Sequence, residues 1–227
     1  MIIISNYKYT CNESYFETID KEEKAYWLGF IYADGNVHKK ETAFRMMLHT
    51  RDTEHLLSFL NCIESNHTTN LRRIGEQEYI GIDIARKKLV KDLIEKGCVP
   101  NKTRKLKFPS ENILPLNLQR HFIRGYFDGD GCISTRLRLK PTNLKRYLSC
   151  VVKFLGTCDM MENILRIIPI SGIKSHELKT SREIYQFKVH SRKKIMTLMD
   201  YLYEDSQIFL KRKHEKYIND VKHYTVP

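Results

Sequence analysis

The sequence predicts an α+β fold of two half-domains that share the order αββαββα and are related by a pseudo-twofold axis. Two helix-like apolar stretches end in the same way, in Asp-Gly: "AYWLGFIYADGNV" over 25–37 and "HFIRGYFDGDGCI" over 121–133. The helix and strand patterns that follow the first stretch then recur in the same order after the second. Such an internal repeat predicts two units with one topology.

Short segments support the repeat because they match at nearly constant spacing. The segment "MLHTRD" (47–52) resembles "FLGTCD" (154–159) at an offset of 107, and "ARKKLVKDL" (85–93) resembles "SRKKIMTLM" (191–199) at an offset of 106. The two Asp-Gly pairs are offset by only 96. The hairpin after the second pair is therefore predicted to be about 11 residues longer than its counterpart.

Residues 1–97 are predicted to form the first half-domain, which begins with a lead-in over 1–20. Asp20 is the predicted N-cap of the first helix, with Glu23 completing a capping box, and Gly35 suits a left-handed position after its end. Hairpins are predicted at 36–50 and 69–85, and helices at 51–64, capped by Asp52, and at 86–97. The helix at 51–64 has an apolar side made of Leu56, Leu57, Phe59, Leu60 and Ile63.

A stretch rich in proline and charge, 98–115, is the predicted connection, and 116–227 is the predicted second half-domain. Asp159 is expected to cap the middle helix of this half. The elements expected there are a helix at 116–130, a hairpin at 132–157, a helix at 160–168, a hairpin at 171–191, a helix at 192–203 and a basic C-terminal helix at 205–224.

Composition narrows the class of protein. No apolar run is long enough for a transmembrane helix, and "MIII" is too short for a signal-peptide core. The six cysteines form no CxxC pair, so we expect reduced thiols, no zinc site and an intracellular location. The formal net charge is +12, and the basic residues are unevenly spread, which favours a polyanionic partner over a merely soluble basic protein.

The two Asp-Gly helices carry the chemistry. Either one alone reads as a turn, and a carboxylate at the negative end of a helix dipole costs up to about 1 kcal/mol. Both helices, however, have small residues four apart, Gly29 with Ala33 and Gly125 with Gly129. Small residues at that spacing let two helix backbones approach closely. The pair therefore predicts a helix–helix interface on the pseudo-twofold axis.

That interface would bring Asp34 and Asp130 side by side. Two carboxylates on two negative helix ends repel each other unless divalent cations lie between them. Hard oxygen ligands favour Mg²⁺. Metal ions shared by two carboxylates suit phosphodiester cleavage, because they can activate water and stabilise the leaving oxygen.

The stretches "WLGFIYADG" (27–35) and "IRGYFDGDG" (123–131) resemble the two signatures of LAGLIDADG homing endonucleases in their monomeric, two-motif form. The resemblance implies that Asp34 and Asp130 bind metal, with the backbone carbonyls of Ala33 and Gly129 contributing. It implies about two or three divalent ions, Mg²⁺ in the first place, with Mn²⁺ or Ca²⁺ able to substitute. The implied partner is double-stranded DNA.

The resemblance also implies that each half supplies a four-stranded antiparallel sheet, and that the two sheets form a saddle over the major groove. "TRLRLK" (135–140) alternates basic and apolar residues, as such a strand requires. The candidate DNA-binding residues are Lys39, Lys40, Arg45, His49, Arg72, Arg73, Arg136, Arg138, Lys140, Lys153, Lys174, Lys179 and Arg182.

Many members of this family place a lysine near the scissile phosphate, on the last strand of a half. Alignment of "YQFKVHSRKK" with "YIGIDIARKK" puts Lys188 there in the second half and Asp83 in the first. Lys188 would stabilise charge on the phosphate or position the attacking water, or else simply contact the DNA backbone. His49 is a candidate for the water network. The asymmetry predicts unequal rates for the two strand cuts.

Three functions are compatible with the resemblance. The first is an endonuclease that makes a double-strand break at a long asymmetric target. The second is an RNA maturase that assists splicing of its intron, and the third is a DNA-binding regulator on an inactive nuclease scaffold. Retention of both aspartates favours the first and argues against the third.

Overall fold

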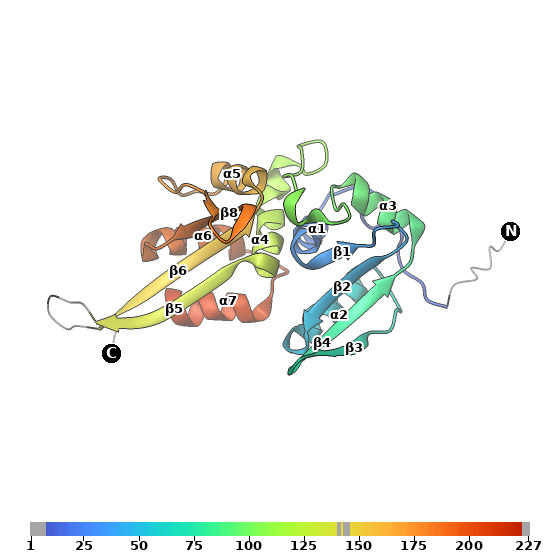
Figure 1. The fold of residues 1–227 in the computed structure, drawn as a ribbon, viewed down its shortest axis with the longest axis horizontal. Helices are drawn as coiled ribbons and strands as arrows, with labels where there is room; N and C mark the ends of the chain where they lie inside the picture. Colours follow the sequence, from blue (N-terminus) through green and yellow to red (C-terminus); the bar gives the residue numbers. More distant parts are fainter. Residues whose placement is uncertain (1–7, 140–141, 143–145, 224–227) are drawn as a thin grey trace.

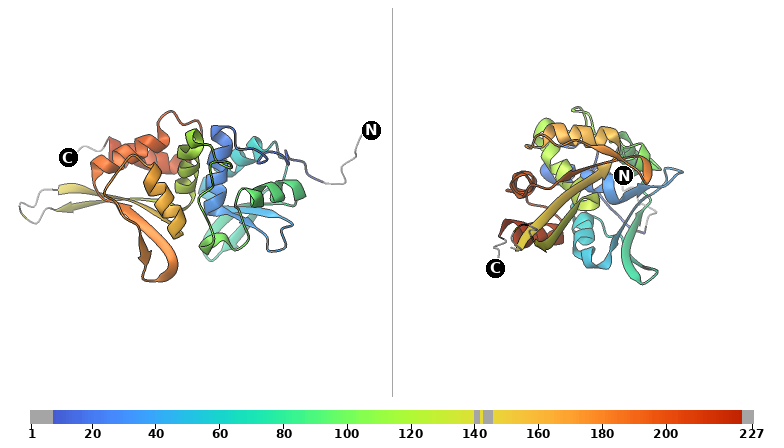
Figure 2. Two further views of the ribbon diagram at one scale, coloured as in Figure 1. Left: turned by 90° about the horizontal axis from the view of Figure 1, so that it is seen from above. Right: turned by 60° about the vertical axis from the view of Figure 1, so that its left-hand side comes forward.

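The computed structural model describes residues 8–139, 142 and 146–223, which form two similar halves side by side (Figure 1). Each half contributes a four-stranded antiparallel sheet. Helices α1 (Glu22–Asp34) and α4 (Gln119–Asp130) stand next to each other between the sheets (Figure 2, left). The predicted α+β fold, with the order αββαββα in both halves, is confirmed.

The first half forms a sheet with the strand order β1-β2-β4-β3. Apolar side chains alternate along β2 and β4 and face the helices, since successive residues of a strand point to opposite faces. After α1, the elements are β1 (Gly35–Val37), β2 (Phe44–His49), α2 (Thr53–Cys62), β3 (Asn70–Ile74), β4 (Gln77–Ile84) and α3 (Lys87–Glu95).

The second half repeats this plan with the strand order β5-β6-β8-β7 and adds one helix at the end. The added helix, α7, lies beside the second sheet near α4 (Figure 1). After α4, the elements are β5 (Cys132–Leu139), β6 (Arg146–Gly156), α5 (Cys158–Ile167), β7 (His176–Leu178), β8 (Ser181–Val189), α6 (Arg192–Tyr203) and α7 (Lys211–Tyr217).

Helices α1 and α4 touch through their backbones. A Cβ atom on Gly29 would collide with the carbonyl oxygen of Phe122, and a Cβ atom on Gly125 would collide with that of Tyr26. One turn further on, a Cβ atom on Gly129 would overlap the methyl group of Ala33. The small residues singled out in the sequence therefore lie at the crossing, where larger side chains would push the helices apart.

Strand register makes positions in the two sheets comparable. Arg45 on β2 lies opposite the second residue after α1. Lys153 on β6 lies opposite the second residue after α4. Across the next strand, Arg45 lies opposite Asp83 and Lys153 lies opposite Lys188. Asp83 and Lys188 are thus equivalent positions of the two sheets.

The predicted ends of the first helix are wrong. Asp20 does not cap α1: its carboxylate pairs with Lys24 at 3.0 Å, while Glu23 accepts a hydrogen bond from Tyr15 Oη at 2.5 Å. Gly35 has φ −76°, so it is extended rather than left-handed. The chain passes straight from α1 into β1, and the strand imposes extended backbone on its first residue.

The predicted caps of the two middle helices also need correction. Asp52 precedes α2 but makes no capping hydrogen bond, because its carboxylate pairs with Arg212 of the other half. The cap of α5 is Thr157, whose hydroxyl accepts a backbone N–H of that helix. Asp159 instead accepts the backbone N–H of Phe108 at 2.6 Å. Both carboxylates bind partners elsewhere in the structure and therefore do not cap their own helices.

Three apolar positions are more exposed than their patterns predicted. Leu137 and Leu139 of β5 are 55% and 56% exposed, because β5 and β6 extend beyond the helices that cover the rest of the sheet (Figure 1). On α2, Leu57 lies at the margin of the apolar side and is 44% exposed. The alternation in β5 therefore separates a basic face from an uncovered apolar one.

Candidate active site

Asp34 and Asp130 are the last residues of α1 and α4, and the helix crossing brings them together. Oδ2 of Asp34 lies 3.4 Å from the position that a Cβ atom would take on Gly129, the residue before Asp130. Protein surrounds most of each carboxylate, but part of each aspartate remains accessible to solvent. The two carboxylates therefore form one accessible acidic site at the ends of the paired helices.

The surroundings of both carboxylates disfavour their charged forms. Burial by the surrounding protein, and then the negative charge of Asp130, raise the pKa of Asp34 to about 6. Burial raises the pKa of Asp130 as well, while the charges of Lys102 and Lys213 oppose both increases. A bound cation would strongly stabilise the charged forms of these carboxylates. Groups with perturbed pKa values are concentrated at functional sites.

An ammonium group that the sequence analysis did not predict binds the last carbonyls of α1. Nζ of Lys102 donates hydrogen bonds to the backbone carbonyls of Ile31, Tyr32 and Ala33 at 2.7, 2.5 and 2.6 Å. The last carbonyls of a helix have no partner inside it and carry partial negative charge. The lysine therefore offsets the unfavourable placement of a carboxylate at this helix end.

The second helix end is closed in the same way. Nζ of Lys213, on α7, donates hydrogen bonds to the backbone carbonyls of Phe127, Gly129 and Gly131 at 2.7, 3.1 and 2.6 Å. This side chain is buried. Both helices thus end in a carboxylate beside a lysine that holds the terminal carbonyls.

The two lysines share a position in the repeat and an electrostatic environment. Each follows the third helix of its own half, α3 for Lys102 and α6 for Lys213. Burial lowers the pKa of each ammonium group to about 8, and the charges of Asp34 and Asp130 act in the opposite direction. Only this shared place after the third helix could have signalled them in the sequence.

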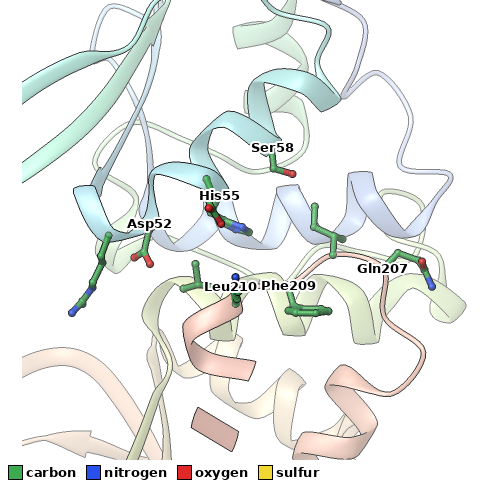
Figure 3. A pocket seen from close by; sticks show the side chains of 10 residues that line it. Asp52, His55, Ser58, Gln207, Phe209 and Leu210 are labelled. Carbon is green, nitrogen blue, oxygen red and sulfur yellow. The ribbon is translucent and has the colours of Figure 1, made fainter. Parts of the chain in front are cut away.

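Helix α7 is anchored to both halves. Nε of Arg212 donates to the two carboxylate oxygens of Asp52, at the start of α2, at 2.8 and 3.0 Å. The backbone N–H of Leu210 donates to Asp128 of α4 at 2.7 Å. Figure 3 shows the pocket between α2 and residues 207–211, where Asp52 and His55 face Leu210. These contacts fix the start of the helix that carries Lys213.

Asp128 is the centre of a buried network that crosses between the halves. Its carboxylate accepts hydrogen bonds from the hydroxyls of Tyr203 at 2.6 Å and Tyr26 at 2.8 Å. Nε2 of His55 lies 3.0 Å from the same Tyr26 hydroxyl. Burial raises the pKa of Asp128, and the charge of Lys213 and the hydrogen bonds oppose that increase. At the equivalent position of α1, the Tyr32 hydroxyl donates a hydrogen bond to the carbonyl of Lys96.

The second sheet gathers four of the predicted basic residues on one face. Arg136, Arg138, Lys153 and Lys188 line one open pocket. Cys132, two residues after Asp130, lines the same pocket, so this basic surface begins close to the acidic site. The face combines positive charge with access to solvent.

The first sheet distributes its basic residues differently. Arg45 and Arg72 lie on one face, and both contact Asp83. Arg73 follows Arg72 on β3 and therefore points to the opposite face. Five further candidates are exposed in turns or near strand ends: Lys39, Lys40, Lys174, Lys179 and Arg182. Lys140 lies outside the described residues.

The two candidates for roles near the phosphate lie on the sheets. Lys188 is on β8 opposite Lys153. His49 ends β2, where its Nδ1 accepts the backbone N–H of Arg51 at 3.2 Å and its ring packs against Tyr79. Lys102 and Lys213, rather than these residues, are the cations that directly contact the helix ends.

Two negative findings apply to residues 8–139, 142 and 146–223. No group of three or more His, Cys, Asp or Glu side chains gathers there as a ready-made metal cage. None of the helices in these ranges has the length and apolar character needed to cross a bilayer. The protein thus supplies two carboxylates to the acidic site, and further ligands would come from backbone carbonyls, water or a bound substrate.

Comparison with known proteins places these features in context. Residues 123–224 match the family model for LAGLIDADG endonucleases, whereas no curated protein matches the chain. The fold is similar to that of I-SmaMI bound to uncleaved DNA with calcium ions (12% identity, 90% of each chain, TM-score 0.61). It is also similar to I-LtrWI bound to target DNA (16%, 90% of this chain and 88% of that one, 0.57) and to I-AabMI bound to uncleaved DNA (13%, 85% and 86%, 0.58).

The sequence match and the structural similarity cover different parts of the molecule. The family model covers α4 from residue 123 onward and the elements after it, including Asp130 and Lys213. The structural similarity covers 90% of the chain, so it extends well beyond this stretch into the first half. Residues 123–224 thus match the family model for LAGLIDADG endonucleases, and 85–90% of the chain is similar in fold to LAGLIDADG meganucleases.

Proposed function

We propose that this chain is a monomeric, divalent-metal-dependent DNA endonuclease that makes a double-strand break at a long asymmetric target. One observation carries the proposal: Asp34 and Asp130 meet at the ends of two touching helices, between two sheets that expose basic side chains. The family match supports hydrolysis, and the DNA-bound meganucleases of the same fold support double-stranded DNA as the partner.

The acidic site suits Mg²⁺. Two carboxylates with raised pKa provide hard oxygen ligands whose mutual repulsion a divalent ion relieves. The carbonyls of Ala33 and Gly129 accept hydrogen bonds from Lys102 and Lys213. A carbonyl oxygen has two lone pairs, so each remains able to serve as a ligand as well. Mg²⁺ retains several waters, which agrees with a site that offers few protein ligands.

The protein's own contribution is to hold charge in place. Asp34 and Asp130 would bind the ions, which supply Lewis-acid activation of water and stabilisation of the leaving oxygen. Lys102 and Lys213 fix the helix ends and place positive charge beside the carboxylates. Lys188 would bind or stabilise a phosphate at the start of the basic face of the second sheet. Charge preorganised in this way requires no rearrangement during the reaction.

The two halves differ at equivalent positions, which suits a target with two unlike half-sites. Lys188 in the second half stands where the first half has Asp83. A lysine is a compact charge suited to phosphate, whereas a carboxylate repels it. The two strands of DNA would therefore meet different surroundings and be cut at different rates.

The test is cleavage of a plasmid library that carries randomised inserts, with Mg²⁺ and then with EDTA. The unchanged chain should linearise a subset of plasmids that share one sequence, and only with Mg²⁺. Asp34→Asn and Asp130→Asn should each lower double-strand cleavage by at least about 100-fold, since each removes several kcal/mol of metal-mediated stabilisation. Binding of the selected target should persist in both variants.

Two results would contradict the proposal. Cleavage that survives both substitutions would show that the acidic site is not catalytic. A chain that binds structured intron RNA but leaves every plasmid intact would instead favour the maturase function. Glu78→Gln, a loss of one negative charge at the exposed start of β4, is the matched control and should leave cleavage unchanged.

A further inference from the structure

Asp83 occupies an unusual position on the open face of the first sheet. Its Oδ1 lies 2.5 Å from Nε of Arg45 on β2, and its Oδ2 lies 3.5 Å from an Nη nitrogen of Arg72 on β3. One carboxylate on the central pair of strands thus holds two guanidinium groups from the strands on either side. All three side chains remain between a third and a half exposed.

These three residues lie on the face that would meet DNA. Phe44, Met46 and their neighbours on the other face of β2 are buried against the helices, so Arg45 points away from the core. Asp83 lies directly opposite Arg45 in the register and therefore shares its face. The same face carries Asn36 of β1, which is two residues after Asp34 and lies opposite Arg45.

The ion pair leaves part of Arg45 free. The carboxylate occupies Nε, so the two Nη nitrogens at the end of the fork remain available as donors. Two parallel N–H donors match the O6 and N7 acceptors that guanine presents in the major groove, which is the commonest specific contact between proteins and DNA. A flexible arginine would lose more side-chain entropy on forming such a contact than one already held in place.

We propose that Asp83 is a positioning residue that holds Arg45 ready to read one guanine in the half-site bound by the first half. The inference rests on the proposed DNA endonuclease function and adds a specificity determinant to it. Arg72, held more loosely at 3.5 Å, supports the same carboxylate from the neighbouring strand.

The second half has no carboxylate at the position equivalent to Asp83. Lys153 and Lys188 stand at the positions equivalent to Arg45 and Asp83. In the described part of the chain, neither lysine forms an ion pair with an acidic residue. Lysine ammonium groups act as point charges without a fixed fork, so this half binds phosphates at these positions rather than one particular base.

Loss of Asp83 should change recognition more than folding. Partly exposed ion pairs contribute little to stability, so a variant without this carboxylate remains folded. The same change removes a negative charge from a surface that faces phosphates, so overall affinity for DNA should be maintained or increase. Reduced discrimination with undiminished affinity is a result that a merely structural role of Asp83 would not produce.

The experiment is a binding selection from a randomised double-stranded DNA library, with Ca²⁺ in place of Mg²⁺ so that the DNA stays uncut. The unchanged chain should select guanine at one position near the centre of one half-site. Its affinity should fall by about tenfold or more when that pair becomes A·T. Asp83→Ala and Arg45→Lys should each lose most of that preference while the other selected positions stay the same.

The control and the contrary outcomes separate this inference from the proposed function. Glu78→Ala removes one negative charge from the same strand and should keep the full preference for guanine. If Asp83→Ala still discriminates as strongly as the unchanged chain, or if no guanine is selected in that half-site, the positioning role is refuted and the endonuclease function stands. If the unchanged chain selects no sequence at all, both are refuted.

Discussion

The two halves of this chain make the same contacts in the interior and carry different side chains on the exposed faces of their sheets. In the interior, α1 and α4 cross at paired glycines and end in paired aspartates, and a lysine that follows the third helix of each half holds each end. On the open faces of the sheets, the pair Arg45 and Asp83 corresponds to the pair Lys153 and Lys188. Shared packing constrains the interior, whereas the exposed positions of the two sheets are free to differ.

The halves also differ in how the lysine is held. Lys102 lies in the connecting segment and is half-buried. Lys213 is buried on a helix that Asp128 and Asp52 anchor from both halves. The lysine that binds the helix end therefore lies in a loop in one half and on an anchored helix in the other. The two helix ends should respond differently when the lysine is replaced.

The helix crossing should show the largest effect on stability. Gly29→Ala and Gly125→Ala each place a methyl group against a backbone carbonyl, which forces the helices apart and should cost about 3 kcal/mol or more in free energy of unfolding. Gly75→Ala is the control: nothing lies within 4 Å of its new Cβ, and only its left-handed φ of +62° costs about 1 kcal/mol. Denaturant unfolding measures all three, and equal losses would show that the crossing is not tight.

The lysines come next, because they test the difference between the halves directly. Lys213→Met leaves three carbonyls without a donor in a buried site and should cost about 3 kcal/mol. Lys102→Met should cost only about 1 kcal/mol, since Lys102, Tyr32 and Ala33 line an open pocket through which water can reach the freed carbonyls. Thermal unfolding compares the two, and a larger loss for Lys102→Met would reverse our account of the two anchors.

A smaller difference is expected at the equivalent positions Asp128 and Tyr32. Asp128→Asn weakens hydrogen bonds from two tyrosine hydroxyls and a backbone N–H and should cost about 2 kcal/mol. Tyr32→Phe loses one hydrogen bond to a carbonyl and should cost about 1 kcal/mol or less. Urea midpoints distinguish the two variants, and indistinguishable midpoints would mean that the Asp128 network does not join the halves.

The last prediction concerns pH and the shared acidic site. The pKa of Asp34 is about 6 in the folded protein and about 3.9 when unfolded, so the folded state binds more protons between these values. Without metal, the stability contributed by Asp34 is present below pH about 4 and is lost as the pH rises through about 6.

Unfolding of the metal-free protein across that range measures this contribution. Asp34→Asn should flatten the decline, and Mg²⁺ should reverse it in the unchanged chain by binding the ionised carboxylates. A metal-free protein that becomes more stable over the same range would contradict the raised pKa. Asp20→Asn, at an exposed carboxylate whose pKa is lowered by its hydrogen bond with Lys24, is the control with the opposite sign.

Local patterns predicted the fold well and the helix ends poorly. The αββαββα order followed from hydrophobic periodicity and turn residues, which act over a few neighbouring positions. The expected caps at Asp20, Asp52 and Asp159 failed, because those carboxylates found partners elsewhere, Arg212 for Asp52 and the backbone of Phe108 for Asp159. A cap is one hydrogen bond, and a tertiary contact of similar strength can replace it.

The sequence by itself determined the repeat, the paired small residues and the two acidic helix ends, since each is written in the order and spacing of neighbouring residues. Only the tertiary structure decided that Lys102 and Lys213 hold those ends and that Asp83 holds Arg45. These contacts join segments that are distant in the chain, and their geometry depends on how two sheets and a helix pair fit together. Basic residues are abundant in this chain, so composition does not mark which of them the fold brings to the site.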